Sequence, residues 1–147
     1  ATSSNTSRNF LQAYVRDDRQ TIVKSYYFGP SQVNQNSVIL KANEEEQKFS
    51  GNNHHFLSEG HHEIMTLENE QALAFLNFVS THHSHRIAVE GKGQNNKSWV
   101  YYLNTQEKDA LSKTYQLGWV MKDIKHIEQL QKTANAQIMY YQQKKAK

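Results

Sequence analysis

A chain of 147 residues with 37% hydrophobic and 11% aromatic residues can bury one ordinary core, so we expect a single folded domain rather than a disordered chain. It contains no cysteine, which excludes a disulfide framework, a thiolate nucleophile and a Cys-ligated zinc or iron–sulfur site. The formal net charge is +3, and no apolar run approaches the roughly 18 residues that a transmembrane helix needs.

The chain begins with seven small, mostly polar residues, Ala-Thr-Ser-Ser-Asn-Thr-Ser, which are typical of a flexible tether. We therefore predict a tether over residues 1–7 and a single α+β domain over residues 8–147. Such tethers follow the cleavage site of exported proteins or the lipidated cysteine of bacterial lipoproteins, so the sequence favours the periplasm or cell envelope. A lipid anchor in a longer native chain is left open. The alternative is an ordinary frayed terminus of a cytoplasmic protein.

The first half of the domain is predicted to hold one short helix and several strands. The helix is predicted from a narrow apolar stripe formed by Phe10, Leu11, Tyr14 and Val15. The strands are predicted from runs of β-branched and aromatic residues. In chain order, the patterns predict a helix over Arg8–Gln20, strands over Thr21–Phe28 and Ser37–Ala42, a solvated turn at Glu44–Glu46 and a hairpin within residues 47–60.

The second half is predicted to contain a β-α-β unit followed by a hairpin. A helix running from Thr66 or Glu68 to about His83 is indicated by one apolar stripe, formed by Ala72, Leu73, Phe75, Leu76, Phe78 and Val79. It lies between predicted strands at His61–Leu67 and His85–Glu90, and the latter pairs with a return strand at Ser98–Leu103. We therefore expect an α+β fold with one mixed or mainly antiparallel sheet of about 4–6 strands. A short N-terminal helix, a central β-α-β crossover helix and a long C-terminal helix would pack on one face.

The stretch from Asp109 to Lys147 is typical of a long helix. Its apolar residues alternate at steps of three and four, a 3.5-residue period that places them on one stripe: Leu117, Val120, Ile124, Ile127, Ala134, Ile138 and Tyr141. Only Gln131 interrupts the series. We favour a division at Gly118 into two helices that both cover the sheet; the alternative is one helix whose exposed end binds a partner. In either case we expect the part through Ile127 to cover the sheet, which leaves the last turns as an interface.

The basic residues gather in the same stretch. Residues 1–107 hold 9 basic and 11 acidic groups, net −2, whereas residues 108–147 hold 8 lysines and 3 acids, net +5. Lysine without arginine makes poor bidentate contacts to phosphate, so a solvated helix face is favoured over nucleic-acid binding.

Histidine is the residue type that most suggests a metal. Seven of the eight fall in three clusters, at 54–55, 61–62 and 82–85. If the strands that begin at His61 and His85 were neighbours, His61 and His62 could meet His83 and His85, with Glu63 as an oxygen ligand, and imidazole suits zinc and similar metals. The alternative is that these are exposed polar residues, and no cofactor is then expected.

Catalytic motifs are weak. The glycine loop Gly91-Lys92-Gly93 joins two strands, so it lacks the helix that a phosphate cradle needs. Glu90, at a strand end, is the one carboxylate worth testing as a catalytic acid or base. The sequence therefore leans away from an enzyme.

Taken together, these patterns favour a non-enzymatic domain that binds another macromolecule or its own copy. We expect a periplasmic or envelope accessory or inhibitory protein that acts through its C-terminal helix; a cytoplasmic immunity or antitoxin-like protein and a His-based metal protein are the alternatives. The predicted binding residues are Ala134, Ile138, Met139, Tyr140 and Tyr141.

Overall fold

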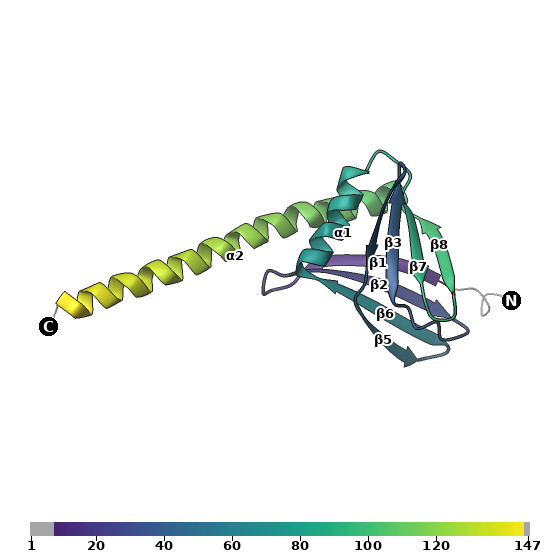
Figure 1. Ribbon diagram of the computed structural model, residues 1–147, viewed down its shortest axis with the longest axis horizontal. Helices are drawn as coiled ribbons and strands as arrows, with labels where there is room; N and C mark the ends of the chain where they lie inside the picture. Colours follow the sequence, from purple (N-terminus) through teal and green to yellow (C-terminus); the bar gives the residue numbers. More distant parts are fainter. Residues whose placement is uncertain (1–7, 146–147) are drawn as a thin grey trace.

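The structure, a computed structural model, describes residues 8–145, and the predicted tether at residues 1–7 lies outside them. In this range the chain forms eight strands and two helices (Figure 1). They are β1 Arg8–Val15, β2 Thr21–Gly29, β3 Ser37–Ala42, β4 Glu45–Phe49, β5 Asn52–Leu57, β6 His61–Glu68, α1 Asn69–Thr81, β7 Ala88–Lys92, β8 Ser98–Tyr102 and α2 Thr105–Lys145.

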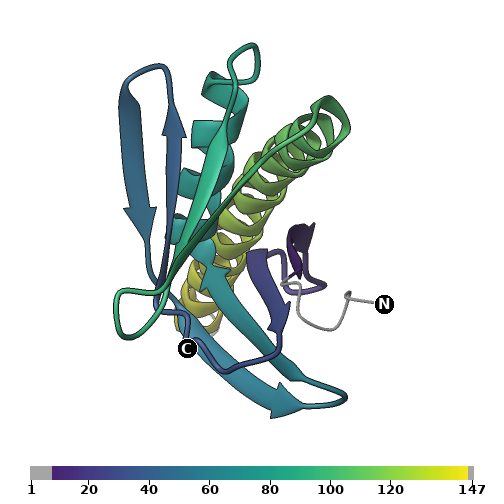
Figure 2. The same ribbon diagram turned by 90° about the vertical axis from the view of Figure 1, so that its right-hand side faces the viewer.

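The strands of residues 8–145 form two antiparallel four-stranded sheets, in the orders β1-β2-β6-β5 and β4-β3-β7-β8. The prediction of one sheet with a β-α-β crossover is therefore wrong. β6 and β7, which flank α1, belong to different sheets, because α1 carries the chain from one sheet to the other. Figure 2 shows the sheets splaying apart, with both helices lying on the open side between them. The predicted β7–β8 hairpin is confirmed.

The predicted N-terminal helix is also wrong. Residues 8–15 form β1, which pairs antiparallel with β2 from Arg8 opposite Phe28 to Val15 opposite Thr21. The residues that suggested a helical stripe divide between the two faces of the strand instead, and Leu11 packs with Ala13 against the core. A tight turn at residues 16–20 joins the two strands, with a hydrogen bond from the Arg16 N–H to the Gln20 carbonyl (2.9 Å). Pairing with β2 outweighs a weak local helical pattern.

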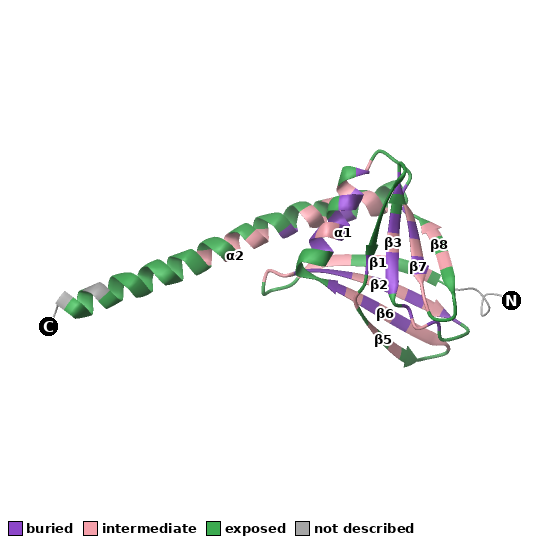
Figure 3. Ribbon diagram, in the orientation of Figure 1, coloured by how far each residue is buried: buried purple, intermediate pink, exposed green. Residues whose placement is uncertain are grey.

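The hydrophobic core lies between the two sheets and α1. All six residues of the predicted α1 stripe are buried, which confirms that part of the prediction. The inner faces of the sheets contribute Val23, Met65 and Leu67 from one side and Val38, Leu40 and Val89 from the other. Figure 3 shows the buried residues concentrated in the body formed by α1 and the sheets, and the outer half of α2 exposed.

α2 is a single helix, so the predicted break at Gly118 is wrong. The helix starts at Thr105 and runs to Lys145, a length of roughly 60 Å at about 1.5 Å per residue. Gly118 is buried where α2 crosses the body. A Cβ on it would lie 2.5 Å from Thr21 Oγ1 and 3.0 Å from Leu73 Cδ2. The glycine therefore permits close packing within a helix rather than ending it.

Asn104 caps the N-terminus of α2. Its side-chain oxygen accepts a hydrogen bond from the Glu107 N–H (2.8 Å), and the Glu107 carboxylate accepts one from the Asn104 N–H (3.0 Å). This reciprocal pair satisfies two backbone donors at the helix start.

Replacing Asn104 with alanine is expected to lower the free energy of unfolding by about 1 kcal/mol, because the first turn of α2 loses its cap. Urea unfolding followed by circular dichroism measures the change. Gln106→Ala, at an exposed position in the same turn, is the control and should have an effect within about 0.5 kcal/mol of zero. Equal effects of the two substitutions would contradict a capping role.

Candidate interaction surface

α2 contacts the body through one narrow face near its N-terminus. Leu111 is buried, Tyr115 packs against the core and Gly118 is buried one turn further on. These residues follow each other at steps of four and three, so they share one side of the helix. The apolar series that begins at Leu117 lies on nearly the opposite side of a helix with 3.6 residues per turn.

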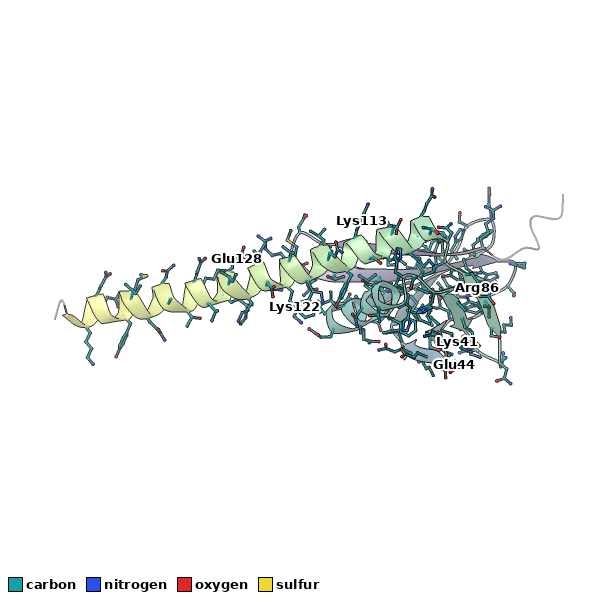
Figure 4. All side chains as sticks on the ribbon, turned by 90° about the horizontal axis from the view of Figure 1, so that it is seen from above. Lys41, Glu44, Arg86, Lys113, Lys122 and Glu128 are labelled. Atoms are coloured by element: carbon teal, nitrogen blue, oxygen red, sulfur yellow. The ribbon has the colours of Figure 1, made fainter. Side chains whose placement is uncertain are left out.

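Two ion pairs hold α2 where it leaves the body. Arg19, in the turn between β1 and β2, donates to the Glu128 carboxylate at 2.8 Å. Lys122 donates to Glu70 of α1 at 2.8 Å, and its ammonium lies 5.1 Å from the centre of the Trp119 ring. Lys122 and Glu128 are both labelled in Figure 4. Partly exposed pairs of this kind contribute little stability.

The exposed apolar series on α2 is the candidate surface, and we call it the α2 seam. It consists of Leu117, Val120, Ile124, Ile127, Gln131, Ala134 and Ile138. Leu117, Val120 and Ile127 are 45%, 53% and 52% exposed, so the expectation that this upper part covers the sheet is wrong. The body packs against the Leu111 face, so the seam points away from it: Ile124 is partly buried and the other residues of the seam are exposed.

The predicted binding residues near the end of the helix are exposed where the structure describes their side chains. Ala134 is exposed, and Ile138, Met139 and Tyr140 are 54%, 59% and 60% exposed. The side chain of Tyr141 lies outside the described residues. Sequence reasoning missed the exposed upper seam and Leu130, which is 56% exposed beside it. The 3.5-residue period from Leu117 to Ile127 was the signal that could have found the upper seam.

The predicted metal residues lie in two separate places. His61 and His62 begin β6 of one sheet, whereas His83 and His85 lie in the turn between α1 and β7, a strand of the other sheet. His61 Nδ1 lies 2.8 Å from His55 Nε2. Among the described residues, no group of three or more histidines, aspartates or glutamates is arranged to hold a metal ion. A metal site at these histidines stays a prediction, which metal analysis of protein purified without chelators or metal columns would test.

The two candidate carboxylates, Glu90 and Glu63, are already bound by other groups of the protein. Glu90 lies between Lys41 (2.6 Å) and Lys92 (2.7 Å), and hydrogen bonds from these lysines lower the pKa of the Glu90 carboxyl. Glu63, suggested as a metal ligand, is fully buried and accepts hydrogen bonds from the backbone of residues 33–35. An ionised carboxylate held in this way is poorly suited to act as a catalytic acid.

The outer face of the first sheet carries an exposed aromatic group above a hollow of about 600 Å³. Phe10 stacks on Tyr26 with ring centres 4.4 Å apart, and Phe56 stacks on His62 at 4.9 Å. These rings lie on neighbouring strands and stack on each other, as cross-strand aromatic pairs do. We therefore interpret this group of aromatic side chains as one that stabilises the sheet.

None of the described helices is both long and apolar enough to cross a membrane. Comparisons of the chain with protein families, with curated proteins and with solved structures found no match. The candidate function therefore rests on the geometry of this molecule alone.

Proposed function

We propose that this protein is a non-enzymatic binding domain that contacts another macromolecule through α2. One observation carries the proposal: a helix of 41 residues presents a periodic apolar stripe to solvent on the side opposite its own body. Exposed apolar surface of this regularity is typical of helix–helix interfaces. A setting in the periplasm or cell envelope, and an accessory or inhibitory role there, are further parts of the proposal.

The body acts as the anchor of this surface. α1 and β1 contact one side of α2, and among the described residues the ion pair furthest along the helix joins Arg19 to Glu128. Beyond this point every described side chain up to Tyr140 is exposed. Most helical stability in proteins comes from tertiary packing, which the exposed outer half of α2 lacks, so packing against a partner would stabilise it. The arrangement suits a helix-in-groove or helix–helix contact.

Site-specific photo-crosslinking in the cells that produce the protein tests the proposal. A photoreactive phenylalanine at Val120 or Ile138 of the seam is expected to give covalent adducts with a protein, because the seam is covered when the partner binds. The control places the same residue at Ala136, which is exposed on the opposite side of the helix. Adducts from the seam alone support the proposal. Equal labelling at all three positions, or no adducts, contradicts it.

A further inference from the structure

The α2 seam is self-complementary when two helices run in opposite directions. With residue 129 of both copies at a two-fold axis, Val120 of one helix lies opposite Ile138 of the other. Ile124 then faces Ala134, so that a large side chain meets a small one. Leu130, 56% exposed and just outside the seam, meets its own copy close to the axis. Every one of these residues is apolar, and each contact between two different residues occurs twice, as a two-fold interface requires.

We infer that the macromolecule bound by the α2 seam is a second copy of this chain, which docks as an antiparallel helix pair. The inference rests on the proposed function and specifies its partner. It also explains why the seam extends up to Leu117 rather than being confined to the free end. In an antiparallel pair, the end of each helix must lie beside the upper seam of the other.

The body leaves room for the second helix. The residues of α2 that face the body, Leu111, Tyr115 and Gly118, lie on nearly the opposite side from the seam. A partner helix on the seam therefore passes along the outside of α2. The paired stretch from Val120 to Ile138 is about 27 Å long at about 1.5 Å per residue.

Charge favours the antiparallel direction over the parallel one. In a parallel pair with the same seam, the residues that flank it would place Asp123 beside Glu128 of the other helix on both sides. Within the paired stretch from Val120 to Ile138, Asp123 faces Gln137 in the antiparallel pair, and the like-charged contact of the flanking residues is that of Glu128 with its own copy. Arg19 of the same chain already donates a hydrogen bond to that carboxylate at 2.8 Å.

Gln131 is the one polar residue of the seam, and it faces Ile127 in this register. A polar residue at a single core position lowers the stability of a helix pair but limits the registers it can adopt. The dimer is therefore expected to be reversible and dependent on protein concentration rather than permanent.

Sedimentation of the purified full chain tests the inference. We expect the wild type to form a dimer, and Ile127→Asp and Ile138→Asp each to raise the dissociation constant at least about tenfold, because each buries a carboxylate in the interface. Both positions are more than half exposed in one chain, so the fold should be retained, and thermal unfolding followed by circular dichroism checks this. The matched control is Ala136→Asp, which adds the same charge on the opposite side of α2. It should dimerise like the wild type.

A wild type that stays monomeric at about 100 µM excludes any dimer with a dissociation constant well below that value and overturns the inference. So does a dimer that resists both seam substitutions or that Ala136→Asp disrupts equally. Adducts from the seam with a different protein, together with a monomeric pure chain, would overturn self-association but leave the proposed function standing. A monomer that also gives no adducts would overturn both.

Introduced cysteines test the direction of the pair, since the chain has no cysteine of its own. Val120→Cys mixed with Ile138→Cys should form a mixed disulfide under mild oxidation. Ile138→Cys alone should not, because the two copies of residue 138 lie about 27 Å apart along the helices. Efficient disulfide formation by Ile138→Cys alone would show a parallel pair and overturn the antiparallel arrangement.

Discussion

Replacing Glu63 with alanine is expected to lower the free energy of unfolding by about 3–5 kcal/mol, the largest effect that we predict for this protein. Such a loss is a large fraction of the roughly 5–15 kcal/mol that stabilises a typical domain. The reason is the position of Glu63. It lies on β6 of the first sheet and is fully buried, and it binds the loop that connects the first sheet to the second.

The Glu63 carboxylate satisfies four donors. The N–H groups of Val33 and Asn34 donate to Oε2 at 2.7 and 3.0 Å. The Gln35 N–H and the Asn53 side-chain amide donate to Oε1 at 2.7 and 2.9 Å. Without the carboxylate, buried donors of the loop lose their acceptor, and the loop no longer holds β3 against the first sheet.

Urea unfolding of Glu63→Ala and Glu63→Gln measures this contribution. Glutamine keeps one oxygen but turns an NH₂ group toward two donors, so its cost should fall between those of the wild type and alanine. The control is Glu59→Gln, which is exposed in the β5–β6 turn and should have an effect within about 0.5 kcal/mol of zero. A Glu63→Ala variant as stable as the Glu59 control would show that the loop does not depend on this carboxylate.

The same residue predicts how stability depends on pH. Burial by itself raises the pKa of the Glu63 carboxyl, but the hydrogen bonds from Gln35, Val33 and their neighbours outweigh burial, and the pKa is lowered from 4.5. A lowered carboxyl pKa stabilises the fold above the unfolded-state pKa, and the contribution is lost as pH falls through the folded-state pKa. Stability should therefore drop below about pH 4.5 in the wild type and less steeply in Glu63→Gln. Parallel pH profiles of the two proteins would contradict this assignment.

Gly118→Ala is expected to destabilise the protein by about 1–3 kcal/mol, although alanine in an exposed helix is normally more stable than glycine by about 1 kcal/mol. Gly118→Ala is expected to destabilise rather than stabilise the protein because the added Cβ would lie 2.5 Å from Thr21 Oγ1 and 3.0 Å from Leu73 Cδ2. Either α2 moves away from β2 and α1, or these side chains shift from their packed positions.

A double-mutant cycle identifies the cause. Thr21→Ala removes the nearest atom, so the double variant Gly118→Ala/Thr21→Ala should recover much of the loss that Gly118→Ala causes alone. Gln116→Ala, exposed on the same helix, is the control for helix propensity. If Gly118→Ala stabilised the protein as it would a solvent-exposed helix, close packing of α2 on the body would be refuted.

Local pattern was sufficient for the elements that bury one continuous face. The α1 stripe and the strands β2, β3, β6 and β8 were predicted within a few residues, because their apolar spacing matches the period of the element. Residues 8–15 were misjudged because a short segment with Phe10, Leu11, Tyr14 and Val15 fits both periods. Only the pairing partner, β2, selects the strand.

The candidate surface was predicted in part. The 3.5-residue period identified the seam and its last turns. It gave no information on which side of α2 faces the body, because the second stripe of Leu111, Tyr115 and Gly118 contains one tyrosine and one glycine and is weakly apolar. Glycine in a helix is ambiguous in a sequence, since it can either end the helix or allow a close approach.

The sequence by itself determined that this chain folds as a cysteine-free α+β protein with a long, lysine-rich C-terminal helix and a periodic apolar stripe, because composition and period depend on near neighbours in the chain. The tertiary structure alone decided the division into two sheets, the role of Glu63 in joining them and the exposure of the α2 seam at every position except the partly buried Ile124. These depend on contacts between residues far apart in sequence, such as Glu63 with residues 33–35 and Gly118 with Thr21. No local pattern encodes such contacts.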